Sequence, residues 1–331
     1  FLLSRNRKSD YSNVIFNTVR EHSIIDNNGS DIYKKNILPL VNKNSNPKVK
    51  VSVIVPTFNR EKTLPDAINS ILNQTFSDFE IIVVDDGSTD STSSVVLDLM
   101  KKHNNIKYIH QSNSGPAAAC NNGIINSRGE YIAFLDSDDL WNEEFLTKTV
   151  KKLDANDNVG IIYTNLYNLN SDTGEISPRD VNVLPSGNLL RKLVFRSLHI
   201  YRGCTLIRKE CFFISGLFNI RLRRNEDRDL NYRLAKYHDF LAINEYLATI
   251  RLHGKNHPRD KNDNFSYVDE IKKFHFPYLS GLLTDWEIAS KFWFFKKRIV
   301  SRFNYVWGRA NYERLNISHS KYFFIELIKS I

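Results

Sequence analysis

The feature that most constrains this sequence is a run of four apolar residues, 81–84, that ends abruptly at Asp85-Asp86-Gly87. A short, continuous apolar run is typical of a strand that is buried on both faces of a sheet. Three more strands and three helices are predicted around it, the strands at residues 51–55, 106–109 and 131–135 and the helices at 64–72, 95–100 and 116–127. This alternation of strands and helices predicts an α/β fold: a Rossmann-like, mostly parallel central sheet with helices on both faces.

Polar clusters follow three of the four predicted strands. They are Pro56-Thr57-Phe58-Asn59, Asp85-Asp86 and Asp136-Ser137-Asp138-Asp139. In open parallel sheets ligands bind outside the carboxyl ends of the strands, where these clusters are expected to meet. The sequence therefore predicts one polar site at that edge.

The triplet Asp136-Ser137-Asp138 places two carboxylates one residue apart. Hard oxygen ligands suit Mg²⁺ or Mn²⁺, and such ions commonly bridge to substrate phosphates. An isolated triplet of this kind is more often a solvated turn or a helix cap. Its position at the predicted sheet edge is what favours a metal site.

Other candidate residues keep two interpretations. Asp85 or Asp86 can accept hydrogen bonds from a nucleoside, or they can belong to the start of the next helix. Glu226-Asp227 lies among Arg223, Arg224 and Arg228, so it can be a surface ion network or hold a general base. His253 can bind a metal or a phosphate, or it can be structural. Trp141 can stack on a sugar or pack in the core.

Several classes of protein are excluded. The chain contains neither G-x-x-x-x-G-K-[ST] nor G-x-G-x-x-G, which excludes phosphate-loop NTPases and Rossmann dehydrogenases. No apolar run approaches the roughly 18–20 residues that span a bilayer. The three cysteines form no C-x-x-C pair, so buried thiols in a reducing compartment are expected.

Three regions are predicted from the change in character along the 331 residues: an extension at 1–48, a catalytic domain at 49–260 and a basic, aromatic helical region at 261–331. The net charge of +9 suits anionic partners. Residues 291–314 concentrate this charge among aromatic side chains, so this segment can lie on an anionic membrane or pack on the protein. Nucleic acid is not an expected partner, because no recognised binding fold accompanies the charge.

Four segments, in this order, resemble a known family. Residues 51–60, 81–90, 114–123 and 131–139 read VSVIVPTFNR, IIVVDDGSTD, SGPAAACNNG and YIAFLDSDD. They are similar to the family 2 glycosyltransferases (GT2) of GT-A fold, and the similarity runs over roughly residues 49–257.

The resemblance implies an inverting transfer from a nucleotide-sugar, usually a UDP-sugar, with Mn²⁺ or Mg²⁺. It assigns the general base to Asp227 beside Glu226, and the metal to Asp138 with Asp136 and His253. The residues that would bind the nucleotide-sugar are Pro56, Thr57, Asn59, Glu61, Asp85, Asp86, Asn113, Gly115, Pro116, Asn121, Asp136 and Ser137. One departure is Cys120, because the family often has arginine there; a nearby arginine can compensate.

The expected function is therefore the transfer of a sugar to a hydroxyl of a glycan or a lipid-linked acceptor in surface polysaccharide biosynthesis. The expected location is cytoplasmic, with peripheral attachment to the inner face of the cell membrane left open. Two alternatives remain: a nucleotidyltransferase of similar α/β architecture, and a relative that binds glycans or a membrane without turnover.

Overall fold

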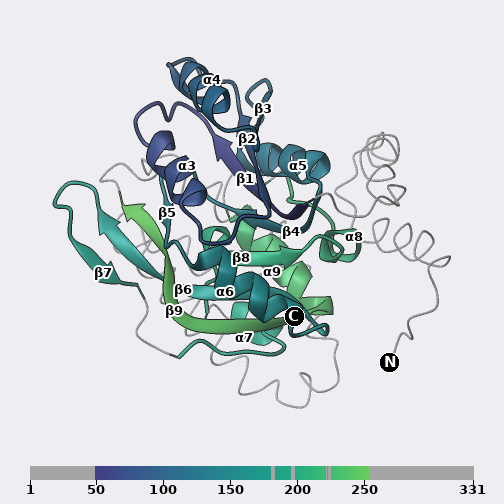
Figure 1. Ribbon diagram of the computed structural model, residues 1–331. Helices are drawn as coiled ribbons and strands as arrows, with labels where there is room; N and C mark the ends of the chain where they lie inside the picture. The colour runs from purple at the N-terminus through teal and green to yellow at the C-terminus, as the bar shows by residue number, and fades with distance from the viewer. Residues whose placement is uncertain (1–48, 180–182, 195–197, 221, 223–224, 253–331) are drawn as a thin grey trace, which may run out of the picture. The chain divides into compact units, whose positions relative to one another are not determined.

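The computed structural model describes residues 49–179, 183–194, 198–220, 222 and 225–252 (Figure 1). Three expectations lie outside the described residues: the extension at 1–48, the metal ligand His253, and the basic aromatic region at 261–331. The division of the chain into three regions therefore stays a prediction. The strands and helices of the expected catalytic domain can be compared with the structure up to Leu252.

The first half of the sheet is parallel, as predicted. Its strands run in the order β3-β2-β1-β4 and are all parallel to their neighbours. The strands are β1 (Val49–Thr57), β2 (Phe79–Asp85), β3 (Ile106–His110) and β4 (Gly129–Phe134). The helices between them are α3 (Leu64–Leu72), α4 (Thr92–Lys102) and α5 (Pro116–Asn126). Figure 1 shows them in purple to blue, with β1 inside this part of the sheet.

The strand β2 is buried along its whole length, as expected for a continuous apolar run in the middle of a parallel sheet. Helix α5 packs closely on strands β1 and β2. A Cβ atom at Gly123 of this helix would lie only 2.4 Å from Cγ2 of Ile54 in β1. The absence of a side chain at Gly123 therefore sets how closely α5 approaches the sheet.

The second half of the sheet is mixed. Its order continues β4-β8-β6-β9-β5, with β8 antiparallel to both β4 and β6, β9 parallel to β6, and β5 antiparallel to β9. A short strand, β7, pairs with β6. The bounds are β5 (Leu140–Trp141), β6 (Val159–Asn170), β7 (Ile176–Pro178), β8 (Thr205–Arg208) and β9 (Asp239–Leu252).

The weak periodicity of residues 165–200 predicts a loop-rich stretch, and this prediction is wrong at its start, because β6 continues to Asn170. The outer part of β6 pairs with β9, from Asn165 opposite Tyr246 to Asn170 opposite Leu252. The pairing shifts register around Asn165, so the strand bends there. Asparagine is depleted in strands, and pairing with β9 on one side and with β7 on the other holds the segment extended.

Five short helices complete the described part of the chain. They are α6 (Phe145–Asp154), α7 (Leu190–Val194), the 3₁₀ turn η1 (Arg202–Cys204), α8 (Cys211–Ser215) and α9 (Glu226–Tyr237). Helix α9 follows Asn225, which has a left-handed backbone with φ 60°. Asparagine tolerates this conformation, so the helix begins sharply with Glu226 and Asp227 in its first turn. The positive end of the helix favours these two carboxylates.

The described residues also bear on membrane spans and on the cysteines. In the part of the chain that the structure describes, no helix is long and apolar enough to cross a bilayer. All three cysteines are free thiols and all are buried.

Candidate active site

The loops that follow β1, β2 and β4 meet at one edge of the sheet, as predicted from the strand order. The amide of Asp86 donates a hydrogen bond to the Thr57 carbonyl at 2.8 Å, which joins the ends of β2 and β1. On the other side, Nη2 of Arg60 lies 3.5 Å from Oδ2 of Asp138. Polar groups from three separate loops therefore face one region.

Asp85 and Asp86 are both buried, and their oxygens accept hydrogen bonds from neutral donors. Asp85 accepts from the Ser88 amide at 2.8 Å and from the Tyr108 hydroxyl at 2.6 Å. Burial, and then Asp85, raise the pKa of Tyr108, so the phenol keeps its proton. These bonds fix the carboxylate at the end of β2.

The carboxylate of Asp86 holds the loop that leads into α5. It accepts from Nε2 of Gln111 at 2.7 Å, from the Ser114 amide at 2.8 Å and from the Gly115 amide at 2.8 Å. Gly115 has φ +90°, which favours glycine. Asp86 thus positions the segment that contains the predicted residues Asn113 and Pro116.

The predicted residues after β1 take part in contacts with the loop before α4. Asn59 accepts from the Thr89 amide at 2.8 Å, and Glu61 accepts from the Ser91 amide at 2.9 Å. Both side chains therefore have structural roles in this structure. Thr57 is different, because its buried hydroxyl has no hydrogen-bond partner among the described residues.

Asn121 is oriented differently from the other predicted nucleotide-sugar residues. Its amide donates to the Phe218 carbonyl and its carbonyl accepts from the Phe218 amide, each at 2.8 Å. This pair of bonds links α5 to the segment before α9. Pro56 is buried within β1, and Ser137 is buried in the loop after β4.

The acidic loop after β4 is held by arginines. Arg251 of β9 donates from its amide to Oδ1 of Asp139 at 2.9 Å, and from Nε to the Asp138 carbonyl at 3.0 Å. Burial, and then Asp136 and Asp138, raise the pKa of Asp139 well above its usual range. The side chain of Asp138 is 17% exposed, and that of Asp136 is 34% exposed.

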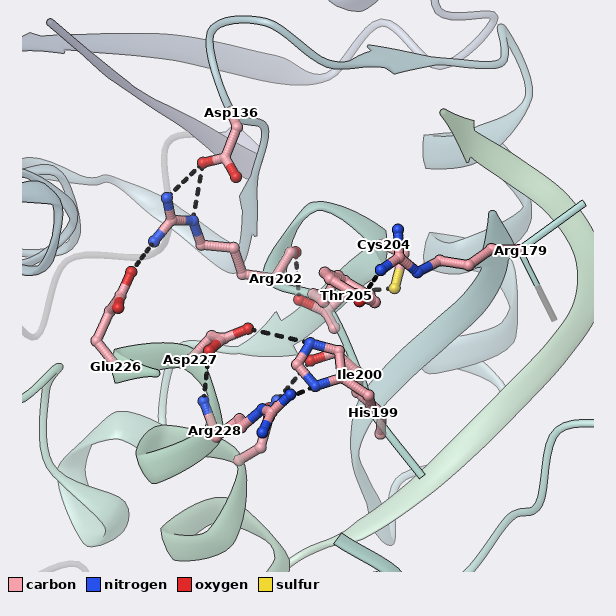
Figure 2. A network of polar contacts seen from close by, with 12 residues as sticks. Asp136, Arg179, His199, Ile200, Arg202, Cys204, Thr205, Glu226, Asp227 and Arg228 are labelled. Carbon is pink, nitrogen blue, oxygen red and sulfur yellow. Dashed lines mark hydrogen bonds and ion pairs between the residues drawn. The ribbon is translucent and has the colours of Figure 1, made fainter. Parts of the chain in front are cut away.

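One guanidinium joins the acidic loop to the acidic pair at the start of α9 (Figure 2). Arg202 contacts Oδ1 of Asp136 through Nε at 2.9 Å and through Nη2 at 2.5 Å. Its Nη1 donates to Oε1 of Glu226 at 2.9 Å. Arg202 was not predicted from the sequence, because it lies in a segment without a motif. The one signal in the sequence was Cys120, which stands where the family often has arginine, so that a nearby arginine could compensate. The charge of Arg202 acts on the Cys120 thiol, although burial still raises the pKa of Cys120 to about 12.

Asp227 lies beside two other basic residues, His199 and Arg228 (Figure 2). Its Oδ1 accepts from the Arg228 amide at 2.8 Å, and its Oδ2 lies 3.6 Å from Nε2 of His199. Nε of Arg228 donates to Nδ1 of His199 at 2.9 Å. An arginine Nε can only donate, so in neutral His199 the proton is on Nε2 and faces Asp227.

The pKa of Asp227 is raised to about 6 by burial and then by Glu226, against the opposing effects of Arg202 and Arg228. A carboxylate with a pKa near this value is ionised at neutral pH and still accepts a proton readily. The structure is compatible with both interpretations of Glu226-Asp227. Asp227 lies in an ion network, and its raised pKa gives it the properties of a general base. Of the three arginines expected around it, Arg228 is described and Arg223 and Arg224 are not.

The type of ligand atom that the acidic residues offer decides whether a divalent cation fits this site. Over residues 49–252, gaps excluded, no group of three or more His, Cys, Asp or Glu side chains is arranged to hold a metal. Mg²⁺ is often bound by one or two carboxylates together with water and substrate phosphates. Asp138, with Asp136 two residues before it, offers such a donor set.

Trp141 has a packing role. Its ring stacks on Phe145 with centroids 4.2 Å apart, and Nε1 donates to the Gly203 carbonyl at 2.7 Å. Only 5% of the residue is exposed. The alternative of stacking on a sugar therefore has no support in the structure.

Comparison with protein families gives one match, which covers part of the site. Residues 52–213 match the family model described as glycosyl transferase family 2. The segment includes Arg202 and the four motifs, apart from Val51 at the start of the first, and it ends before Glu226.

Curated relatives are glycosyltransferases by name. One from Rickettsia conorii, the uncharacterized glycosyltransferase RC0461, is 36% identical over 205 residues, which are 62% of this chain and 33% of the relative. The GalNAc(5)-diNAcBac-PP-undecaprenol beta-1,3-glucosyltransferase of Campylobacter jejuni is 46% identical over 118 residues, 35% of this chain and 38% of the relative. The chain spans about a third of the length of the first curated relatives it matches.

Solved structures give the same fold. TarS residues 1–349 of S. aureus in complex with UDP-GlcNAc is 25% identical with a TM-score of 0.54, covering 63% of this chain and 60% of that one. The mannosyltransferase PcManGT from Pyrobaculum calidifontis, in complex with GDP-Man and Mn²⁺, is 20% identical with a TM-score of 0.52, covering 74% and 70%. The sheet of the described residues is therefore a GT-A fold, as the resemblance implied.

Proposed function

Residues 52–213 of this chain belong to glycosyl transferase family 2, and from that premise we propose an inverting enzyme that transfers a sugar from a UDP-sugar to a hydroxyl. The observation that carries the proposal is the meeting of carboxylates from two distant segments at one sheet edge. Asp136 and Asp138 follow β4, Glu226 and Asp227 begin α9, and Arg202 contacts one member of each pair.

The nucleoside part of the donor is assigned to the ends of β1 and β2. Asp85 and Asp86 are held there by neutral donors, and Oδ2 of Asp86, like each oxygen of Asp85, accepts one of these bonds and keeps lone-pair capacity for another. The buried hydroxyl of Thr57 lies at the end of the adjacent strand. The complex of TarS with UDP-GlcNAc supports a UDP-sugar as donor.

The transfer step uses Asp227 as the general base. In its ionised form Asp227 removes the proton of the acceptor hydroxyl while that oxygen forms a bond to the anomeric carbon. The bond from this carbon to the diphosphate breaks on the opposite face, which inverts the configuration. Asp138 and Asp136 are the residues that would hold Mn²⁺ or Mg²⁺, whose chemistry would be to offset the negative charge that grows on the diphosphate.

The acceptor is assigned to the class of glycans or lipid-linked glycans. The relative from Campylobacter jejuni is named for an undecaprenol-linked substrate, which supports this class. Residues 291–314 carry an excess of lysine and arginine among aromatic residues, a composition suited to an anionic bilayer surface. We assign the enzyme to surface polysaccharide biosynthesis at the cytoplasmic face of the membrane.

The proposal is tested with UDP-sugars labelled in the sugar, incubated with the full chain, Mn²⁺ and a set of lipid-linked and free glycan acceptors. Release of UDP together with a labelled glycan is the expected result. Release of pyrophosphate would instead indicate a nucleotidyltransferase. Binding of the donor without any transfer, to water or to an acceptor, would favour a non-catalytic relative.

A further inference from the structure

His199 lies between the proposed base, Asp227, and the guanidinium of Arg228 (Figure 2). Its Nε2 is 3.6 Å from Oδ2 of Asp227, and its Nδ1 accepts a hydrogen bond from Nε of Arg228 at 2.9 Å. The side chains of His199 and Asp227 are only 24% and 19% exposed, so the contact between them is largely shielded from water. Polar contacts are stronger in such surroundings than at the surface.

The imidazole ring of His199 is also held from its flank. The ring of Tyr201 meets it edge-on, with centroids 4.0 Å apart and an angle of 63° between the planes. The guanidinium of Arg179 lies over the Tyr201 ring at 4.2 Å, and its Nη1 donates to Oδ1 of Asn168 at 2.8 Å. Asn168 belongs to the outer part of β6. This part of the sheet thus supports, through two side chains, the ring that lies beside Asp227.

The contact with Arg228 decides the charge of the imidazole. Because Nε of an arginine only donates, Nδ1 of His199 has to present a lone pair. A second proton on the ring would go to Nδ1, where it would meet the hydrogen of Nε and bring two cations into contact. His199 is therefore held neutral, with its hydrogen on Nε2. A neutral N–H group can stabilise the ionised form of Asp227 without the full charge that would make this carboxylate a weak base.

Other charged groups act on Asp227 as well. Among the described residues they are Glu226 beside it on α9, Arg202 on η1, and Arg228 itself, whose amide donates to Oδ1. Burial and Glu226 outweigh the two arginines, and the pKa of Asp227 is raised to about 6. A neutral donor at Oδ2 opposes a further rise, since hydrogen bonds to the ionised form lower the pKa of a carboxyl group. Contacts of this kind are often long before substrate binds and shorten afterwards, so 3.6 Å is compatible with that role.

We infer that His199, kept neutral by Arg228, is a positioning residue that orients Asp227 and holds it ionised for proton uptake. The inference rests on the proposed function, because it takes Asp227 as the base. His199 itself gains no proton: the proton of the acceptor hydroxyl goes to a carboxylate oxygen of Asp227, and the hydrogen on Nε2 stays in place. A histidine that only filled space would leave the protonation of Asp227 unchanged.

The first test uses the full chain with ¹⁵N-labelled histidine and no donor, so it does not depend on activity. The imidazole signals of His199 are identified as those missing from His199→Gln. At about pH 6, where an ordinary histidine is mostly charged, we expect nuclear magnetic resonance to show a neutral ring with its hydrogen on Nε2. A charged ring, or a hydrogen on Nδ1, would overturn the inference and leave the proposed function intact.

The second test compares the pH dependence of kcat in the original chain and in His199→Phe, which keeps a ring against Tyr201 but has no N–H group. The apparent pKa of kcat should rise by about one pH unit, because the ionised form of Asp227 loses a donor. The plateau of kcat should fall about tenfold, with little change in KM for the UDP-sugar. An apparent pKa that stays the same or falls would also overturn the inference.

His199→Gln is the conservative companion, because its side-chain amide keeps a neutral N–H group at about the reach of Nε2. It should restore the apparent pKa of the original chain, and it keeps the comparison informative if His199→Phe folds poorly. His103→Phe, at the end of α4, is the control and should change neither kcat nor its pH dependence. If the original chain transfers no sugar, the proposed function fails whatever the state of the His199 ring.

Discussion

The two acidic regions of the site are stabilised in different ways. At the ends of β2 and β3, Asp85 and Asp86 accept hydrogen bonds from amides, a phenol and a carboxamide. At the end of β4 and the start of α9, Asp136 and Glu226 contact the Arg202 guanidinium, and Asp227 lies beside His199. We call the first the neutral region and the second the charged region.

The difference follows from what each region has to do. Neutral donors orient a carboxylate without removing its net charge, which suits recognition of a ligand N–H or hydroxyl group. Cations beside carboxylates change how readily those groups take up a proton or bind a metal. A change in the neutral region should therefore act mainly on donor binding, and a change in the charged region mainly on the rate of transfer.

The largest expected effect lies in the charged region. Asp227→Asn should lower kcat by about a thousandfold, since the amide cannot take up the proton of the acceptor. Affinity for the UDP-sugar, measured by calorimetry, should change little. Asp239→Asn, at the exposed start of β9, is the matched control and should keep full activity. Undiminished turnover in Asp227→Asn would remove this residue from the mechanism and weaken the comparison.

The same variant should make the protein more stable at neutral pH. The pKa of Asp227 is raised from 3.8 to about 6 in the folded chain, so the fold prefers the protonated form. The stabilising contribution is complete below about pH 4 and is lost as the pH rises through 6. At pH 7.5 urea unfolding should therefore show Asp227→Asn to be more stable by up to about 3 kcal/mol. The two proteins should have the same stability near pH 4, and a constant difference at both pH values would contradict this explanation.

A change in the neutral region tests the other side of the comparison. Asp86→Asn replaces one acceptor oxygen with a donor, so the loop at Ser114 and Gly115 loses part of its support. The KM for the UDP-sugar should rise about thirtyfold, in line with the loss of a hydrogen bond to a charged group. The value of kcat should change much less. Asp98→Asn in the exposed part of α4 is the control, and a fall in kcat alone in Asp86→Asn would contradict the division of roles.

The smallest effect is the pH dependence of the unmodified chain. Because Asp227 acts in its ionised form and its pKa is raised to about 6, kcat should rise with pH and level off above 7. At pH 5 it should be about tenfold below the plateau. A profile that is flat between pH 5 and 8 would show that another group accepts the proton.

The sequence was sufficient for the parallel half of the sheet because its signals are local. The run at residues 81–84 and the polar clusters after three of the four strands mark the strand ends directly. The charged region depends on contacts between distant residues: Arg202 is 66 positions from Asp136 and 24 from Glu226. His199 beside Asp227 likewise has no local pattern. The outer part of β6 was missed partly for the same reason, since it pairs with β9, far along the chain, as well as with the nearby β7.

The burial of Cys120, Cys204 and Cys211 has a practical consequence for experiments in solution. Burial raises the pKa of Cys120 and of Cys204 to about 12, so little thiolate is present at neutral pH to react with a maleimide. A new cysteine at the exposed position of Asn113 would therefore take up a fluorophore selectively. Its emission would report movement of the neighbouring loop in real time, without first removing the native sulfur atoms.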